Sequence, residues 1–201
     1  SKLSNYVEYV YDNIEDTNNA ISELFLNLGF KKYQKLTSVI DIVPDQDLLW
    51  NGLQSRARNM IRKSLKHNIT VEQTKIDNMW LIKFYEMLTK TFNRQGINIP
   101  HSKEFYLTLE ELFKKDKLFC LTAYCSSEIV GKAIFLKNEY QLIYFSGTST
   151  SKGVKTASNS LLLWEAIKFA SNNNIRVFDL GGIGMKSLDK FKKSFGGKNK
   201  E

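Results

Sequence analysis

Three apolar segments follow one another in the middle of the chain, over residues 118–124, 129–136 and 140–147. Short polar turns join them, and apolar segments with such short connections are typical of an antiparallel meander. A helical pattern over about 156–173 and a buried run at 175–180 come next. They have the lengths of a crossover to a parallel strand, so the chain is predicted to build a mixed sheet.

Helices and further strands are predicted on either side of the meander. The fold class predicted from them is α/β (α+β), a mixed, mostly antiparallel sheet flanked by helices on both faces. Strand-forming residues are concentrated over 30–43, and the glycine-rich tail 181–197 is expected to be a short closing segment. Helices are expected at 12–28, at 47–66, from Asp77 to near Gly96, and from Ser102 onward.

Composition excludes several classes of protein. With 42% hydrophobic residues in 201, the chain can bury one core and is not intrinsically disordered. Cys120 and Cys125 have no C-x-x-C spacing, which excludes a disulfide scaffold and a structural zinc site. His67 and His101 have no matched neighbours either, so no metal is expected. No apolar run approaches the roughly 18 residues of a membrane span, and we expect a cytoplasmic protein.

The net charge of +8 is distributed unevenly along the chain. Residues 1–50 contain four lysines and eight acidic residues, so they carry −4, and residues 51–201 carry the remaining +12. A body this basic attracts anions, for example a nucleotide, a phosphorylated carrier, RNA or an acidic membrane face. The sign of the charge does not distinguish these partners.

The most basic predicted helix has no acidic residue between Asp47 and Glu72. Arg58, Arg62 and Lys66 are spaced four residues apart and therefore share one face of this helix. Arg58 and Arg62 are candidate phosphate-binding residues. The alternative is a charged face that is simply solvated.

A stretch of small and basic residues at 146–156 leads into the helix predicted from about Thr156. Small residues let backbone N–H groups approach an anion, and the helix N-terminus adds its dipole. Lys152 and Lys155 would supply charge, so these two lysines and Thr156 are candidate donor-binding residues. The spacing of a Walker loop is absent, and the alternative is a solvated loop that ends in a capped helix.

An acidic residue followed by glycines ends the strand predicted at 175–180, in the run FDLGGIG. Open mixed sheets bind ligands at the ends of their strands. Asp179 is therefore a candidate for accepting a proton, orienting an amine or binding a hydroxyl, and Gly181 and Gly182 are candidate donor-binding residues. The alternative is that the carboxylate only fixes the glycine turn through its backbone N–H groups.

The segment FKKSFGG at 191–197 combines cations with aromatic rings. A lysine held there would stabilise a developing oxyanion or bind a phosphate, whereas Lys193 is expected to be solvated. No G-x-S-x-G motif is present, and neither cysteine has the context of a nucleophile. If the protein is an enzyme, we expect it to align two substrates for direct attack.

Three segments in this order resemble the Fem-type branch of the GNAT superfamily. This branch contains the peptidoglycan bridge-forming aminoacyltransferases and the related BioF2-like acyltransferases. The segments are RNMIRKSLK at 58–66, LLWEAIKFA at 162–170, and FDLGGI at 178–183 followed by FKKSFGG at 191–197. The similarity covers roughly residues 50–197, and the D-x-G-G and F-K-x-x-F-G-G pair is its most specific part.

The resemblance implies a mixed GNAT sheet and transfer of an activated acyl group to an amine. The donor co-substrate would be aminoacyl-tRNA or, in the BioF2-like branch, acyl-CoA, and the acceptor a peptidoglycan precursor peptide. Matched by motif, Phe191 lines the donor site, and Lys192 polarises the acyl carbonyl or binds the donor phosphate. Asp179 matches the acid at the strand end. The GNAT pyrophosphate loop is not cleanly present at 150–158, which favours the Fem-type branch.

Proteins of this family usually contain two tandem GNAT-like halves. The resemblance therefore implies a GNAT domain at 46–201, preceded at 1–45 by the tail of an incomplete N-terminal domain. We expect the chain, which begins with Ser1, to lack a portion that contributes to the acceptor site. The predicted function is that of an acyl or aminoacyl transferase. A catalytically silent GNAT-fold module that binds nucleotide or RNA, and a half-protein that needs its missing domain, are the alternatives.

Overall fold

The computed structural model describes residue 23, residues 26–31 and residues 36–200 of the chain. The chain divides into two compact units, residues 1–36 with residue 201, and residues 37–200. In the first unit, a turn at Gly29 follows helical residues 26 and 27, and the φ of +85° at this position favours glycine. Most of the helix predicted at 12–28 lies outside the described residues.

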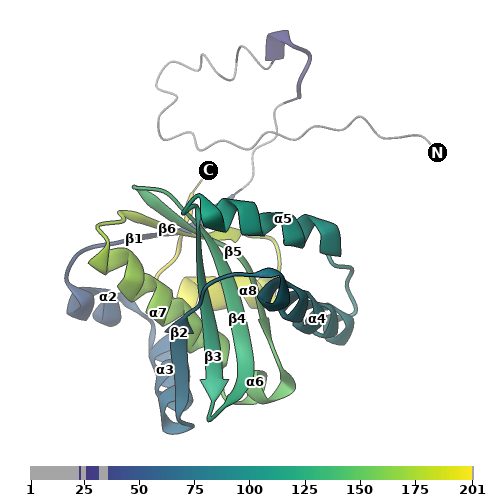
Figure 1. Cartoon of the computed structure of the whole chain (residues 1–201). Coiled ribbons are helices and arrows are strands. Elements are labelled where there is room, and N and C mark those ends of the chain that lie inside the picture. The colour runs from purple at the N-terminus through teal and green to yellow at the C-terminus, as the bar shows by residue number, and fades with distance from the viewer. Residues whose placement is uncertain (1–22, 24–25, 32–35, 201) are drawn as a thin grey trace. The chain divides into compact units, whose positions relative to one another are not determined.

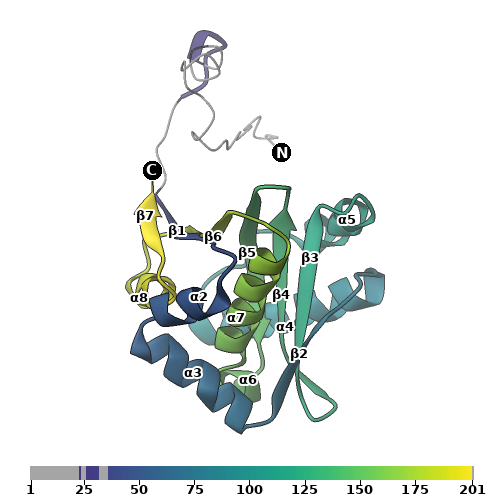
Figure 2. The same ribbon diagram turned by 90° about the vertical axis from the view of Figure 1, so that its left-hand side faces the viewer.

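Seven strands of the unit 37–200 form one sheet. Its order is β2-β3-β4-β5-β6-β1-β7, shown from two directions in Figure 1 and Figure 2. All neighbouring strands pair antiparallel except β5 and β6, which are parallel, so the predicted meander and crossover are confirmed. The strands are β1 (Thr37–Asp41), β2 (Ile69–Gln73), β3 (Leu118–Cys125), β4 (Glu128–Lys137), β5 (Gln141–Ser149), β6 (Val177–Gly182) and β7 (Lys198–Lys200).

Helices cover both faces of this sheet, as predicted. One hydrophobic core joins the sheet to α2, α3, α7 and the end of α8, and a second core joins it to α4 and α5. In Figure 1, α3 and α7 lie on one side of the sheet and α4 and α5 on the other. The helices described in this unit are α2 (Gln46–Gly52), α3 (Ser55–Lys66), α4 (Asn78–Gln95), α5 (Lys103–Lys114), α6 (Ser151–Lys155), α7 (Ser158–Asn172) and α8 (Lys186–Ser194).

The single helix predicted over 47–66 is wrong, because the chain leaves the helix after α2. Leu53 adopts extended backbone and is buried in the core, with 3% of its surface exposed. The backbone groups at this break find other partners. The N–H of Gln54 donates to the Ser194 carbonyl at 2.9 Å, and the Arg58 guanidinium donates to the carbonyls of Asn51 and Leu53. The break therefore joins α2, α3 and the end of α8.

The loop expected within 146–156 is largely regular structure instead, because β5 runs on to Ser149 and the short helix α6 follows. Thr150 begins α6 by accepting a hydrogen bond from the N–H of Gly153 at 3.1 Å, while its own N–H donates to the Val130 carbonyl at 3.0 Å. Glycine is required at position 153, since a Cβ there would lie 2.1 Å from the Val130 carbonyl oxygen. Ala157, with a φ of +59°, separates α6 from α7.

Both ends of the unit 37–200 meet in the sheet. β1 pairs with β6 on one side and with β7 on the other, and Lys198 forms an exposed ion pair with Asp41 at 2.9 Å. The compact unit thus begins at Thr37, ahead of the boundary expected at residue 46, and the further domain expected at 1–45 stays a prediction. The predicted closing segment contains a full helix, α8.

Candidate functional site

The two parallel strands of the sheet diverge along their length. β5 and β6 pair over only three residues each, 141–143 and 177–179. Beyond these residues both strands continue without pairing to each other. Open sheets bind ligands at the carboxyl ends of parallel strands, where backbone groups are available to a ligand. We call these strand ends, residues 144–149 and 180–184, the divergence.

A β-bulge lies where the divergence begins. Phe135 on β4 pairs with Tyr144, whereas its neighbour Ile134 pairs with Ser146, so Phe145 is the extra residue. A bulge redirects the side chains beside it. The Tyr144 ring packs against the core beneath α7, and the Phe145 ring packs against the core beneath α4 and α5. Burial raises the pKa of Tyr144 to about 12, so its phenol keeps its proton near neutral pH.

Lys192, on α8, reaches the end of β6. Its ammonium donates hydrogen bonds to the carbonyls of Gly181, at 3.0 Å, and Gly182. A Cβ added to Gly181 would lie 3.8 Å from this Nζ and 3.6 Å from the Tyr144 carbonyl oxygen on β5. Lys192, the glycine turn and β5 therefore meet in one place. Lys192 is 5% exposed, and burial lowers the pKa of its amine, while two nearby carboxylates oppose this shift.

Asp179 also contacts the glycine turn. Its carboxylate accepts a hydrogen bond from the N–H of Gly181 at 2.6 Å. Gly181 has a φ of +83°, a conformation that side chains with a Cβ rarely adopt. The structural alternative for Asp179, that it fixes this turn, is thus confirmed, and a chemical role for it stays a prediction.

Phe191 anchors the helix that carries Lys192. Its half-buried ring packs edge-on against Phe195, with ring centroids 5.2 Å apart, and contacts the core beneath α7. The neighbouring Lys193 is exposed, as predicted. One face of α8 therefore faces the protein and places the Lys192 amine at β6.

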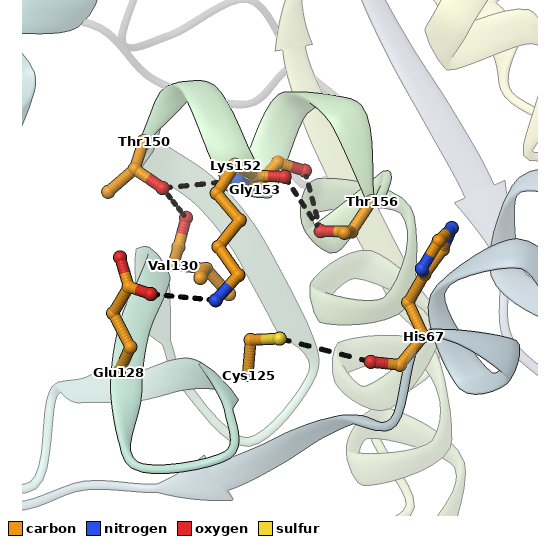
Figure 3. Close-up of polar contacts among 8 residues, drawn as sticks. All are labelled: His67, Cys125, Glu128, Val130, Thr150, Lys152, Gly153 and Thr156. Carbon is orange, nitrogen blue, oxygen red and sulfur yellow. Dashed lines mark hydrogen bonds and ion pairs between the residues drawn. The ribbon is translucent and has the colours of Figure 1, made fainter.

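The candidate donor-binding residues Lys152, Lys155 and Thr156 lie at a different place, shown in part in Figure 3. Lys152 extends to the turn between β3 and β4, where it pairs with Glu128 at 2.8 Å. The Thr156 hydroxyl donates to the Lys152 carbonyl at 2.9 Å, and the Ser64 hydroxyl on α3 donates to the Thr156 carbonyl at 2.7 Å. Lys155 is exposed. The structure does not bring the Lys152 side chain to the divergence.

Arg58 and Arg62 both contact protein groups near α2. Arg58 donates to carbonyls at the end of that helix. Arg62 donates to the Asn59 side chain at 3.4 Å, and its guanidinium carbon lies 5.4 Å from the centroid of the Trp50 ring. These contacts hold α3 against α2, and phosphate binding by the two arginines stays a prediction.

A group of aromatic rings that was not predicted covers the α4 and α5 side of the divergence. His101, just ahead of α5, stacks on Phe105 with ring centroids 4.2 Å apart, and lies almost parallel to Phe145 at 6.2 Å. His101 is exposed, Phe105 is 39% exposed and Phe145 is half-buried. We call these three residues the aromatic group. No local sequence pattern places His101 beside β5, because the path of the loop ahead of α5 depends on packing.

The part of the chain that the structure describes contains no cluster of three or more His, Cys, Asp or Glu side chains arranged to hold a metal ion. It also contains no helix long and apolar enough to cross a membrane.

Comparison with known proteins gives a match to one domain family. A family model described as an acetyltransferase (GNAT) domain matches residues 55–193, and a search of curated proteins finds no match. Among solved structures, FemX is similar with a TM-score of 0.74 at 16% identity, over 89% of this chain and 65% of that chain. The predicted resemblance to Fem-type GNAT proteins is confirmed.

Two further solved structures share the fold. One is the C-terminal domain of a putative lysylphosphatidylglycerol synthetase from Agrobacterium fabrum, with a TM-score of 0.58, 10% identity, and coverage of 87% of this chain and 60% of that chain. The other is L-PGS from Bacillus licheniformis, with a TM-score of 0.58, 12% identity, and coverage of 88% and 61%. This chain spans less than two thirds of the length of FemX and of both these proteins.

Proposed function

We propose that this chain, which belongs to the acetyltransferase (GNAT) domain family, transfers an acyl or aminoacyl group from an activated donor to an amine. The observation that carries the proposal is the meeting of Lys192, the glycine turn and β5 where the parallel strands diverge. The amine attacks the donor carbonyl directly, and no covalent enzyme intermediate forms. Catalysis then consists of aligning the two substrates and stabilising the oxyanion.

Lys192 has the chemistry that this proposal requires. A lysine ammonium has three N–H donors, and two of them go to the carbonyls of Gly181 and Gly182. The third donor is proposed to polarise the acyl carbonyl of the donor. Because the side chain is buried, its charge acts on the developing oxyanion with little screening by water. Phe191 and Asp179 position this amine and the glycine turn.

We propose the donor and the acceptor from the family and from the charge of the chain. The donor is proposed to be aminoacyl-tRNA or acyl-CoA, since both present phosphates to a body with a net charge of +12. We propose that the phosphates contact Thr156, the exposed Lys155, and Lys152 once it has left its ion pair with Glu128. Arg58 and Arg62, on α3, are proposed to bind further phosphates of the donor. The resemblance to Fem-type proteins supports an amine acceptor such as a peptidoglycan precursor peptide.

Turnover of a substrate panel tests the proposal. Acetyl-CoA, a longer acyl-CoA and a charged tRNA are each combined with a UDP-linked precursor peptide, and the acylated product is measured. Lys192→Met is expected to lower kcat by about 100-fold, the effect of losing one oxyanion donor. Lys193→Met, an exposed neighbour on the same helix, is the matched control and is expected to retain wild-type turnover.

The outcomes separate an enzyme from a binding module. Because Lys192→Met leaves two carbonyls without their donor, we expect a loss of about 1–3 kcal/mol in the free energy of unfolding. Turnover is therefore compared at a temperature where both variants are folded. Binding of a donor without turnover by any pair would replace the proposal with the silent nucleotide- or RNA-binding module. Equal turnover by the two variants would remove Lys192 from the mechanism.

A further inference from the structure

We infer that His101 is the general base that takes the proton from the acceptor amine during transfer. The inference rests on the proposed function, because it requires an amine that attacks an acyl carbonyl. An alkyl amine is mostly protonated near neutral pH and has no free electron pair until it loses a proton. A positioned imidazole is the side chain best suited to accept that proton at neutral pH.

The aromatic group places His101 beside the divergence. Phe145, at the bulge of β5, directly follows Tyr144, whose carbonyl oxygen lies 3.6 Å from the position that a Cβ on Gly181 would take. The His101 ring lies almost parallel to the Phe145 ring, with 6.2 Å between centroids and 14° between planes. The imidazole is thereby held near the strand end that borders the proposed transfer site. Lys192 approaches that strand end from α8, on the side of the core beneath α7.

The imidazole is fixed in orientation but its nitrogens are available. Phe105 stacks on the His101 ring at 4.2 Å with 25° between planes, and Tyr106 contacts its edge at 6.2 Å. Within the described residues, no protein atom forms a hydrogen bond with either ring nitrogen. The side chain is exposed. An incoming amine can therefore reach an imidazole whose ring plane is already set.

The other titratable groups at the divergence already have different roles. Lys192 donates two hydrogen bonds to carbonyls, Asp179 accepts one from the N–H of Gly181, and Asp189 accepts one from the N–H of Gly184. Burial raises the pKa values of Tyr144 and Tyr106, so both phenols hold their protons near neutral pH. Among the described groups beside the divergence, His101 combines an exposed side chain with ring nitrogens that form no hydrogen bond with the protein.

Within the described residues, the charged side chains nearest to His101 along the chain are Lys103 and Glu104, at the start of α5. The titratable ring that contacts it is Tyr106. From α4, Tyr85 packs against Tyr106, and from β5 the contact is the uncharged Phe145. The rings that contact the imidazole are therefore uncharged.

The step moves one acyl group and removes two protons from the acceptor, which begins as an ammonium. His101 takes the first proton at an imidazole nitrogen, and the electron pair thus freed on the amine nitrogen forms the new C–N bond. The bond from the acyl carbon to the sulfur or oxygen of the donor then breaks, its electron pair leaves with that atom, and that atom takes the second proton from the new C–N nitrogen through solvent. The imidazolium releases its proton to solvent, which restores neutral His101.

The pH dependence of kcat tests this role, with the only other histidine of the chain as the control. Wild-type turnover is expected to fall on acidification as one group becomes protonated. His101→Gln is expected to lower kcat by about 100-fold or more and to lose this acidic limb. His67→Gln, at the exposed end of α3, is expected to keep both rate and pH profile. Added imidazole is expected to restore part of the rate of His101→Gly.

The outcomes distinguish this inference from the proposed function. Wild-type turnover with an unchanged profile in His101→Gln would overturn the role of His101 and leave the transferase intact. No turnover by wild type with any donor would overturn both. If His101→Gln raised only KM and kept the acidic limb, His101 would bind the acceptor rather than take its proton, and the inference would be wrong.

Discussion

Lys132 is a cation held inside the second core of the protein. Its side chain, on β4, is 2% exposed. The amine donates to the Trp80 carbonyl at 3.2 Å and lies 4.2 Å from the centroid of the Trp80 ring. Burial lowers the pKa of Lys132 from 10.5 to about 8, and the positive charge of Lys83 adds to this effect. The folded protein therefore releases this proton more easily than the unfolded chain.

The free energy of unfolding is expected to rise with pH between about 8 and 10.5. In this window the unfolded chain still binds the lysine proton that the folded protein has lost, so a higher pH favours folding. Below about pH 8 both states bind the proton, and this dependence disappears. Urea unfolding of wild type and Lys132→Met across the window measures it. Identical pH slopes in the two proteins would contradict a depressed pKa.

The short helix α6 is held on β4 by a close backbone approach. Gly153→Ala would place a Cβ 2.1 Å from the Val130 carbonyl oxygen, so the helix must move. We expect a loss of about 1–3 kcal/mol in the free energy of unfolding, the usual cost of overpacking. Gly52→Ala, at the end of α2, adds a Cβ that meets no atom within 4 Å and is expected to be almost neutral. Urea unfolding compares the two, and equal stabilities would show that α6 is not held there.

The sheet as a whole could be predicted where its signals are local. The meander follows from apolar segments with short turns, and the crossover from a helix of suitable length. β2 was missed because its alternating Ile69 and Val71 occupy only five residues between two helices. α8 was not predicted, although Leu188, Phe191 and Phe195 have helical spacing, because glycines flank this segment on both sides. β7 contains only Lys-Asn-Lys, and pairing with β1 alone makes it a strand.

The candidate site could be predicted only in part, for a similar reason. Motifs identified Lys192 and Asp179. An acid before glycines at a strand end, and a lysine between aromatic residues, are local patterns that the sequence alone displays. The contact between Lys192 and Gly181 depends on where α8 packs. The position of His101 beside Phe145 depends on a bulge and on the path of a loop, and neither has a local pattern.

The proposed activity requires the donor to bind at the divergence. Hydrogen–deuterium exchange of backbone amides, with and without a saturating donor that supports turnover, locates it directly. We predict slower exchange over residues 144–149 and 180–194, with no change in the edge strand β2. Slower exchange confined to the opposite end of β5 would contradict the account. That end has a cavity of about 290 Å³ lined by residues that include Lys115, Lys137 and Phe169.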